Sequence, residues 1–311
     1  LAEGSANVSG EVNLAAESYG VDISVNKFPL QKLFKDVPLG NLTTLLTAKG
    51  VKFNPMQEGA TSNILLKVDS LYYNRYDYTD IKLKVALSDG IYNGSIVSNC
   101  QDAKMSLTLQ GLLSEQKQTL NLNGDIPNLN LQNLNFSNDN FSLVSSVDIS
   151  ASADTMGVYA VKGGIGKTVV RMYGAKRTLQ GLNMDIFADT TQINANVEAQ
   201  GLYLSFFSPQ SLDNFISAVD SVIVEAKNQT DSLKFNIDQI KAKMPSCTLS
   251  FSLEDNPIVS ALLKRNGITL GQAQLDFASN GKEPIYLKSG IYSLKQGEAS
   301  IDSICANLNQ N

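Results

Sequence analysis

Residues 81–87 read IKLKVAL, and this stretch decides the fold. Apolar residues stand at Ile81, Leu83, Val85 and Leu87, and two of the three residues between them are lysines. A repeat of two residues is the period of a β-strand, because successive side chains of a strand point to opposite faces. The stretch therefore predicts a strand with one apolar and one polar face, as in an antiparallel sheet that has one face in water.

The same alternation recurs along nearly all of the 311 residues, for example over 147–152 and 193–199. About fifteen such strands and about four short helices are expected from the periodicity. At ~4.8 Å between neighbours, fifteen strands in one sheet would extend about 70 Å. The fold class expected is therefore mainly β: an elongated, curved antiparallel sheet, shaped like a taco or half-pipe, with a few short amphipathic helices. A folded-over sheet and a split sandwich are the alternatives.

The domain organisation follows from where the alternation is interrupted. Residues 1–125 are expected to form a β-meander module with a helical insert near 29–50, where apolar residues are spaced by three and four. Residues 126–311 form a second β module with helices near 209–227 and 256–266, each opened by a proline. A strand is also expected around 233–237. The boundary lies in an asparagine-rich stretch and is soft, so one continuous domain is the alternative.

Composition excludes several functions. The chain has no histidine, which removes the commonest general base and most transition-metal sites, so we expect neither an enzyme nor a metal or other cofactor. The net charge is −5 and no cluster of lysine and arginine occurs, which argues against nucleic acid as a partner. Cys100, Cys247 and Cys305 lie far apart without CxxC spacing, and three small buried thiols are favoured over one disulfide with a free thiol.

One motif imitates a nucleotide site. Residues 162–168 read KGGIGKT, similar to the phosphate loop of the ParA and MinD ATPases. A phosphate loop must follow a buried strand and open a helix. The β-branched stretch after Thr168 instead predicts another strand, so the motif is expected to be a turn and no nucleotide is expected to bind.

The apolar faces of the expected strands define a candidate lipid groove. If they line up, they form an unbroken apolar path for an acyl chain; at ~0.8 kcal/mol per CH₂, keeping two sixteen-carbon chains out of water is worth roughly 25 kcal/mol. The candidate lining residues are Ile64, Leu66, Leu83, Val85, Leu107, Leu109, Ile149, Ile193, Val197, Leu204, Phe235 and Phe251.

Several stretches resemble the TamB family of the AsmA-like superfamily, in the form found in Gram-negative bacteria of the Bacteroides kind. The stretches are residues 37–43 (VPLGNLT) with 48–50 (AKG), 124–129 (GDIPNL), 182–203, and 206–209 (FFSP). The resemblance is diffuse in pattern but spans most of the chain.

The resemblance implies an interior segment of a periplasmic protein that is anchored in the inner membrane and reaches toward the outer membrane. It implies a β-taco with an apolar inner surface, phospholipid or another acyl-chain ligand as the partner, and a role in lipid transport. The alternative is a scaffold for the assembly of outer-membrane or secreted proteins, with an outer-membrane barrel assembly protein as partner. A purely structural β-sandwich is the third interpretation.

Overall fold

The computed structural model describes residues 4–35, 37–280 and 285–309. It is mainly antiparallel β-sheet, with 62% of residues in strands and 13% in helices, and the sheet is open rather than closed on itself. This confirms the fold class that the alternation predicts. The chain divides into two compact units: unit 1 is Leu1–Ser152 with Ile165–Thr178, and unit 2 is Ala153–Gly164 with Leu179–Asn311. The expected soft seam at 125/126 falls inside a strand of unit 1.

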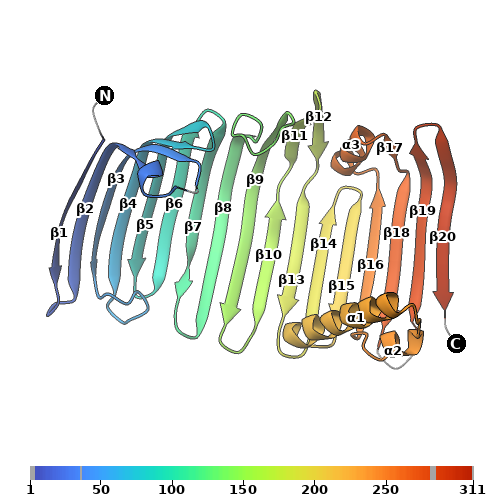
Figure 1. The fold of residues 1–311 in the computed structure, drawn as a ribbon. Coiled ribbons are helices and arrows are strands. Elements are labelled where there is room, and N and C mark those ends of the chain that lie inside the picture. The colour runs from blue at the N-terminus through green and yellow to red at the C-terminus, as the bar shows by residue number, and fades with distance from the viewer. Residues whose placement is uncertain (1–3, 36, 281–284, 310–311) are drawn as a thin grey trace. The chain divides into compact units, whose positions relative to one another are not determined.

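Unit 1 contains a meander of eight strands, β1 to β8, in which consecutive strands pair antiparallel (Figure 1). These strands are β1 (Ser5–Asn13), β2 (Ser18–Pro29), β3 (Leu39–Val51), β4 (Thr61–Tyr73), β5 (Tyr76–Ser88), β6 (Ile91–Cys100), β7 (Ala103–Leu113) and β8 (Lys117–Asn130). Then follow β9 (Phe141–Asp154), which pairs with β11 (Thr168–Met172), and β12 (Ala175–Leu179).

The helical insert expected near 29–50 is wrong. Of the described residues in this segment, Leu30–Lys32 form a single 3₁₀ turn and residues 39–51 form strand β3. Apolar spacings of three and four fit a helix locally, but Leu46 and Ala48 also alternate, and they pair with β2 on one side and β4 on the other. The ladder hydrogen bonds on both sides outweigh the local preference.

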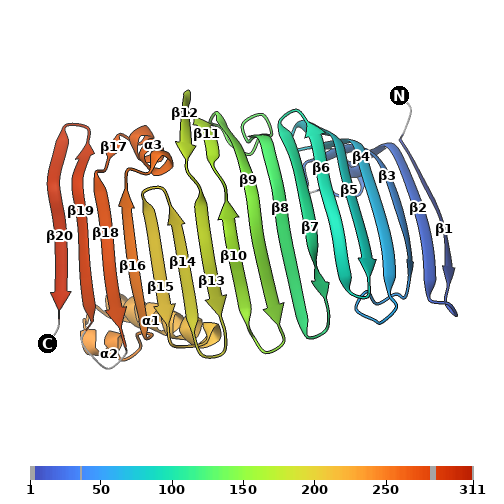
Figure 2. The same cartoon turned by 180° about the vertical axis from the view of Figure 1, so that it is seen from behind.

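Unit 2 contains β10 (Tyr159–Ile165) and a second antiparallel series (Figure 2). Its strands are β13 (Leu182–Ala188), β14 (Ile193–Ala199), β15 (Leu202–Ser208), β16 (Cys247–Glu254), β17 (Ile268–Thr269), β18 (Gln272–Ser279), β19 (Tyr286–Gln296) and β20 (Ala299–Asn309). Pairing follows chain order, except that β16 pairs with β18 and the short β17 with β19.

Among the described residues, unit 2 has three helices; the two longer ones lie in the two expected helical regions, and the short third one was not expected. Helix α1 (Leu212–Ser232) begins after Ser211, whose side chain accepts a hydrogen bond from the Asn214 amide, and α3 (Pro257–Arg265) begins after Asn256. The strand expected around 233–237 is wrong, because α1 ends at Ser232 and the short α2 (Ile237–Lys241) follows after four residues.

The molecule exposes much more surface than a globular protein of its mass. Its accessible surface is 18,906 Å², whereas a globular monomer of this mass exposes about 13,000 Å². Within each unit the strands agree with this, because most of their residues are half-buried or exposed and few are buried.

Candidate functional site

The register of unit 1 lines up two neighbouring rows of apolar residues on one face of the sheet. Both rows cross eight strands, β1 to β8, and all sixteen positions are Val, Ile, Leu, Ala or Gly. The first row is Val8, Ile23, Leu46, Leu66, Leu83, Ile96, Leu107 and Gly124. The second row is Gly10, Val21, Ala48, Ile64, Val85, Gly94, Leu109 and Leu122.

These two rows, called the apolar face of unit 1 below, contain half of the candidate groove residues. The six candidates from unit 1's first eight strands are Ile64, Leu66, Leu83, Val85, Leu107 and Leu109. All six are half-buried. Fully buried apolar side chains such as Ala60, Cys100 and Leu134 lie instead at the strand ends or in the loops there.

Unit 2 has an apolar face of the same kind. Val197, Leu204 and Phe251 are direct neighbours in one row across β14, β15 and β16. The adjacent row consists only of apolar residues over seven strands: Ile186, Ala195, Phe206, Leu249, Phe277, Leu287 and Leu308. Ile193 lies two positions from Ala195 on the same face and is only 6% exposed.

The remaining two candidates stand apart from these rows. Ile149 lies on β9 and is half-buried. Phe235 lies in the connection between α1 and α2 and is 77% exposed, so it belongs to no strand. The period-two spacing of Leu233, Phe235 and Ile237 predicted a strand, but the segment is the end of one helix, a short linker and the start of the next.

A pocket of about 410 Å³ lies at one end of the apolar face of unit 1. Ile64, Val85 and Leu87 line it from the sheet, and Phe53 and Pro55 line it from the loop that joins β3 to β4. The remaining lining residues are Tyr19, Lys52, Ala60, Thr61, Ser62, Tyr92 and Leu113. Its volume is within the range of small-molecule sites, ~300–1,000 Å³.

Two tyrosines frame this pocket, and each lies across a glycine of the neighbouring strand. A Cβ atom on Gly50 would lie 2.5 Å from the Tyr19 hydroxyl, and a Cβ atom on Gly111 would lie 2.4 Å from the Tyr92 hydroxyl. Tyr19 donates to Ser62 Oγ at 2.9 Å, and Tyr92 donates to the carbonyl oxygen of Thr119 at 2.8 Å. The two glycines therefore make room for aromatic walls whose polar ends are satisfied.

The loop over the pocket is fixed by hydrogen bonds to the sheet. The amide of Gly59 donates to Asp89 Oδ1 at 2.7 Å, and the amide of Asp89 donates to the carbonyl of Ala60 at 2.9 Å. Phe53 stacks against Tyr19 with ring centroids 6.3 Å apart. At the edge of the pocket, Lys52 pairs with Glu17 at 3.0 Å.

The opposite ends of these strands carry a buried polar cluster. Leu134, from the loop after β8, packs with Cys100 and Ala103, and Tyr76 and Tyr78 pack against them. The Tyr76 hydroxyl lies 3.3 Å from Cys100 Sγ and donates to Asp102 at 3.1 Å.

The two tyrosines of this cluster are held neutral. Burial and then the contact with Cys100 raise the pKa of Tyr76, and burial raises the pKa of Tyr78. Among the described residues, the Tyr78 hydroxyl has no hydrogen-bond partner. This end of the apolar face is closed by the loop after β8.

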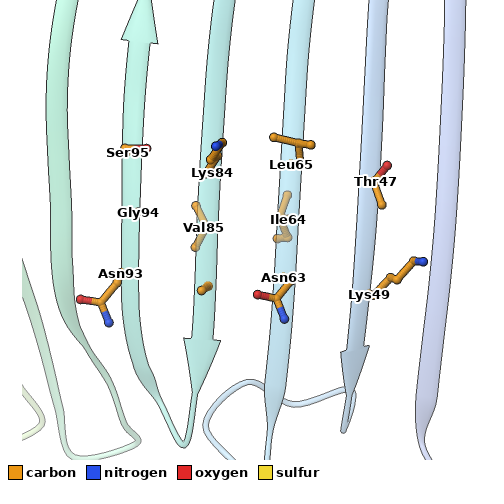
Figure 3. Close-up of a pocket in the computed structure, with 11 residues that line it drawn as sticks. Thr47, Lys49, Asn63, Ile64, Leu65, Lys84, Val85, Asn93, Gly94 and Ser95 are labelled. Carbon is orange, nitrogen blue, oxygen red and sulfur yellow. The ribbon is translucent and has the colours of Figure 1, made fainter.

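The other face of unit 1 is polar and has a hollow of about 550 Å³ (Figure 3). Two rows cross it: Lys49, Asn63, Ala86 and Asn93, and beside them Thr47, Leu65, Lys84 and Ser95. Two lysines, two asparagines and two hydroxyl side chains line this hollow together with Ile64, Leu65 and Val85, so it combines polar groups with apolar surface. The two faces of the same strands therefore differ, because lysine, asparagine, serine and threonine side chains occur in these rows and are absent from the two rows of the apolar face.

The nucleotide-like motif forms no phosphate site. β10 precedes the turn and β11 follows it, so Gly166 opens no helix. The amide of Gly166 donates to the carbonyl of Ser146 at 2.9 Å, and Thr168 Oγ1 lies 2.7 Å from Ser145 Oγ. The expectation of a turn between strands is confirmed.

The other sequence-based expectations concern thiols, metals and membrane spans. Cys100 and Cys247 are buried, Cys305 is exposed, and all three are free, so the expectation of a third buried thiol is wrong. Within the described residues, no three or more His, Cys, Asp or Glu side chains are grouped to hold a metal ion. None of the helices in residues 4–35, 37–280 and 285–309 combines the length and apolarity that crossing a membrane requires.

Sequence reasoning missed the pocket at the end of unit 1. Tyr19, Phe53 and Tyr92 are far apart in the chain, and only the register brings them to one end of the sheet. The available signal was the pair of glycines inside strands, Gly50 and Gly111, because a glycine in a strand often marks a close approach of another group.

Comparison of the chain with protein-family models, with curated proteins and with solved structures finds no match in any of the three.

Proposed function

We propose that this chain is an interior segment of a TamB-like envelope protein and offers an apolar groove for phospholipid transport. In this proposal the protein is periplasmic, its parent chain is anchored in the inner membrane, and it catalyses no reaction. The observation that supports the proposal best is the pair of rows in unit 1, which holds sixteen consecutive positions without a polar side chain.

The dimensions of the rows suit an acyl chain. Eight strands give seven inter-strand spacings, or about 34 Å measured across the sheet. The hydrocarbon core of a bilayer is about 30 Å thick and holds two lipids tail to tail, so the chains of one lipid reach roughly 15 Å. A lipid that lies along the rows, across the strands, therefore finds apolar contact over more than its own length.

The chemistry of the rows also suits movement rather than tight capture. The rows contain no polar group that would have to be desolvated or paired along the way, so a chain that shifts by one strand exchanges one set of apolar contacts for a similar one. A single acyl chain would bind most tightly in the pocket near Tyr19, because the aromatic rings of Tyr19, Phe53 and Tyr92 line it.

The first experiment is native mass spectrometry of the purified chain, and a phospholipid that co-purifies with it is the expected result. A fluorescent fatty acid then tests the pocket. Leu87→Trp, which fills the pocket from its floor, should weaken binding at least tenfold. Ala86→Trp, one residue away and exposed on the polar face, is the matched control and should leave binding unchanged.

Two outcomes would contradict the proposal. Absence of bound lipid together with no fatty-acid binding by the folded chain would remove the lipid function. Binding of outer-membrane strand peptides without any lipid would favour the protein-assembly scaffold instead.

A further inference from the structure

The connection between α1 and α2 exposes large apolar side chains to an unusual degree. Leu233 is 90% exposed, Phe235 is 77% exposed and Ile237 is 50% exposed. Single exposed apolar residues are common on protein surfaces, but three at alternate positions of one short segment need an explanation. Residues 233–237 are called the helical tip below; Figures 1 and 2 show it within unit 2, where α1 is followed by α2.

The helical tip is held in place by a buried glutamine. Gln229, on the last turn of α1, is only 4% exposed. Its Nε2 donates to the carbonyl of Asn236 at 2.9 Å, and its Oε1 accepts from the amide of Asn236 at 2.8 Å. The amides of Leu233 and Lys234 donate to carbonyls of the last turn, at 3.2 Å and 3.1 Å. The exposed side chains therefore belong to an ordered turn, which the hydrogen bonds of Gln229 and of the backbone amides hold in place.

A second contact joins α1 to the segment that follows α2, through Lys243 two residues after the end of that helix. Glu225 accepts a hydrogen bond from Gln229 Nε2 at 2.9 Å and pairs with Lys243. These bonds hold the pKa of Glu225 below its usual value, the one with Lys243 having the larger effect. The two helices are thus held together, and the turn that joins them carries Leu233 and Phe235.

The charge around the helical tip has the sign opposite to that of the whole chain. Residues 225–243 contain four lysines and three acidic residues, a net charge of +1, whereas the chain as a whole carries −5. Among the described residues, Lys227 and Lys234 form no ion pair. Lys234 lies between the two most exposed apolar side chains of the helical tip, Leu233 and Phe235.

We propose that the helical tip contacts the surface of an anionic lipid bilayer, with Leu233 and Phe235 inserted among the acyl chains and Lys227 and Lys234 at the headgroups. Apolar side chains that alternate with lysine match the membrane interface, where the apolar groups enter the hydrocarbon edge and the ammonium groups stay with the phosphates. This contact is distinct from the apolar faces of the sheet and does not depend on them.

The bilayer fits the helical tip better than a protein groove does. The hollows described above are lined by none of the tip side chains, and Leu233, at 90% exposure, has little contact with its neighbours. A free-standing apolar side chain gains most from a fluid apolar phase that adapts to its shape. The Leu-Lys-Phe order further provides a cation within one residue of each inserted group.

The test is co-sedimentation of the full chain with vesicles made of equal parts of phosphatidylcholine and phosphatidylglycerol. The double substitution Leu233→Ser with Phe235→Ser should weaken binding at least tenfold. The matched control, Ile301→Ser with Ile304→Ser, removes two exposed apolar side chains from β20 and should leave binding unchanged. Lys234→Glu should weaken binding to these vesicles and have no effect with phosphatidylcholine alone.

A spectroscopic test uses the absence of tryptophan from the chain. Phe235→Trp introduces a single reporter, whose emission should shift to shorter wavelength when the anionic vesicles are added. The proposal fails if the wild-type chain does not sediment with vesicles, if the double serine variant binds like the wild type, or if the reporter emission stays constant. If the wild-type chain binds vesicles but neither co-purifies with lipid nor binds fatty acid, the proposed function fails and this inference is unaffected.

Discussion

Leu109→Asp is the sharpest test of a continuous apolar path. Leu109 lies in the second row of unit 1, between Gly94 on β6 and Leu122 on β8. A Cβ atom on Gly94 would lie 3.6 Å from Leu109 Cδ1 and 3.2 Å from Val85 Cγ2, so these two side chains close over the glycine. A carboxylate at this position, the seventh of the eight, interrupts the row one strand from its end on β8.

The expected magnitude follows from the half-burial of Leu109. Losing half of a leucine's burial lowers the free energy of unfolding by about 1–1.5 kcal/mol, which is small beside the ~5–15 kcal/mol usual for folded proteins. An acyl chain that covers the new carboxylate must desolvate it without a partner, at a cost of ~3 kcal/mol or more. A cost of ~3 kcal/mol corresponds to a dissociation constant about 100-fold larger.

The assay is displacement of a fluorescent fatty acid from the purified chain, with lipid transfer between vesicles as a second readout. Thr108→Asp is the matched control, because Thr108 is the preceding residue of β7 and is exposed on the polar face. Circular dichroism establishes that both variants are folded. If folded Leu109→Asp binds and transfers lipid as well as the wild type, the apolar row is no conduit.

Three further predictions concern stability and reactivity. Gly50→Ala should lower the free energy of unfolding by about 1–3 kcal/mol in denaturant titrations, because the new Cβ atom would lie 2.4 Å from a backbone oxygen. Gly20→Ala is the control and should leave the free energy of unfolding unchanged, because its Cβ atom would meet nothing closer than 3.7 Å. Equal free energies of unfolding for the two variants would contradict this prediction. The neutral Tyr76 phenol is favoured in the folded chain, since burial raises its pKa; the stability it contributes is therefore complete below about pH 10 and declines above it. The melting temperature of Tyr76→Phe should fall less than that of the wild type as the pH rises above about 10. Melting temperatures that fall equally with pH in the two proteins would refute the prediction. Iodoacetamide should label exposed Cys305 in the native chain and Cys247 only after unfolding, because Cys247 is buried and burial raises its thiol pKa. Mass spectrometry of timed samples gives the order of labelling, and labelling of Cys247 before Cys305 would contradict the prediction.

The periodicity of the sequence determined the strands and their two faces. Ile81, Leu83, Val85 and Leu87 alternate with lysine and alanine, and no other regular structure places these residues on one side. The two longer helices were also readable near 209–227 and 256–266, and Pro257 after Asn256 does open the second. The first was expected to open at Pro209, whereas the structure caps it at Ser211 and extends it over Leu212–Ser232. These features depend on residues near one another in the chain, so local physics is sufficient to predict them.

The tertiary structure decided which strands are neighbours and therefore which side chains lie next to each other across strands. The segment 39–51 became a strand because β2 and β4 offered ladder partners on both sides, and Phe235 left the sheet because α1 continued to Ser232. The two unbroken rows depend on the register of seven strand pairs, and a slip of one residue in any pair would exchange its apolar and polar faces. The pocket near Tyr19 and the Gln229 network likewise depend on contacts that only the folded chain brings together. Local alternation specifies a face for each strand, whereas a continuous surface requires the pairing of all of them.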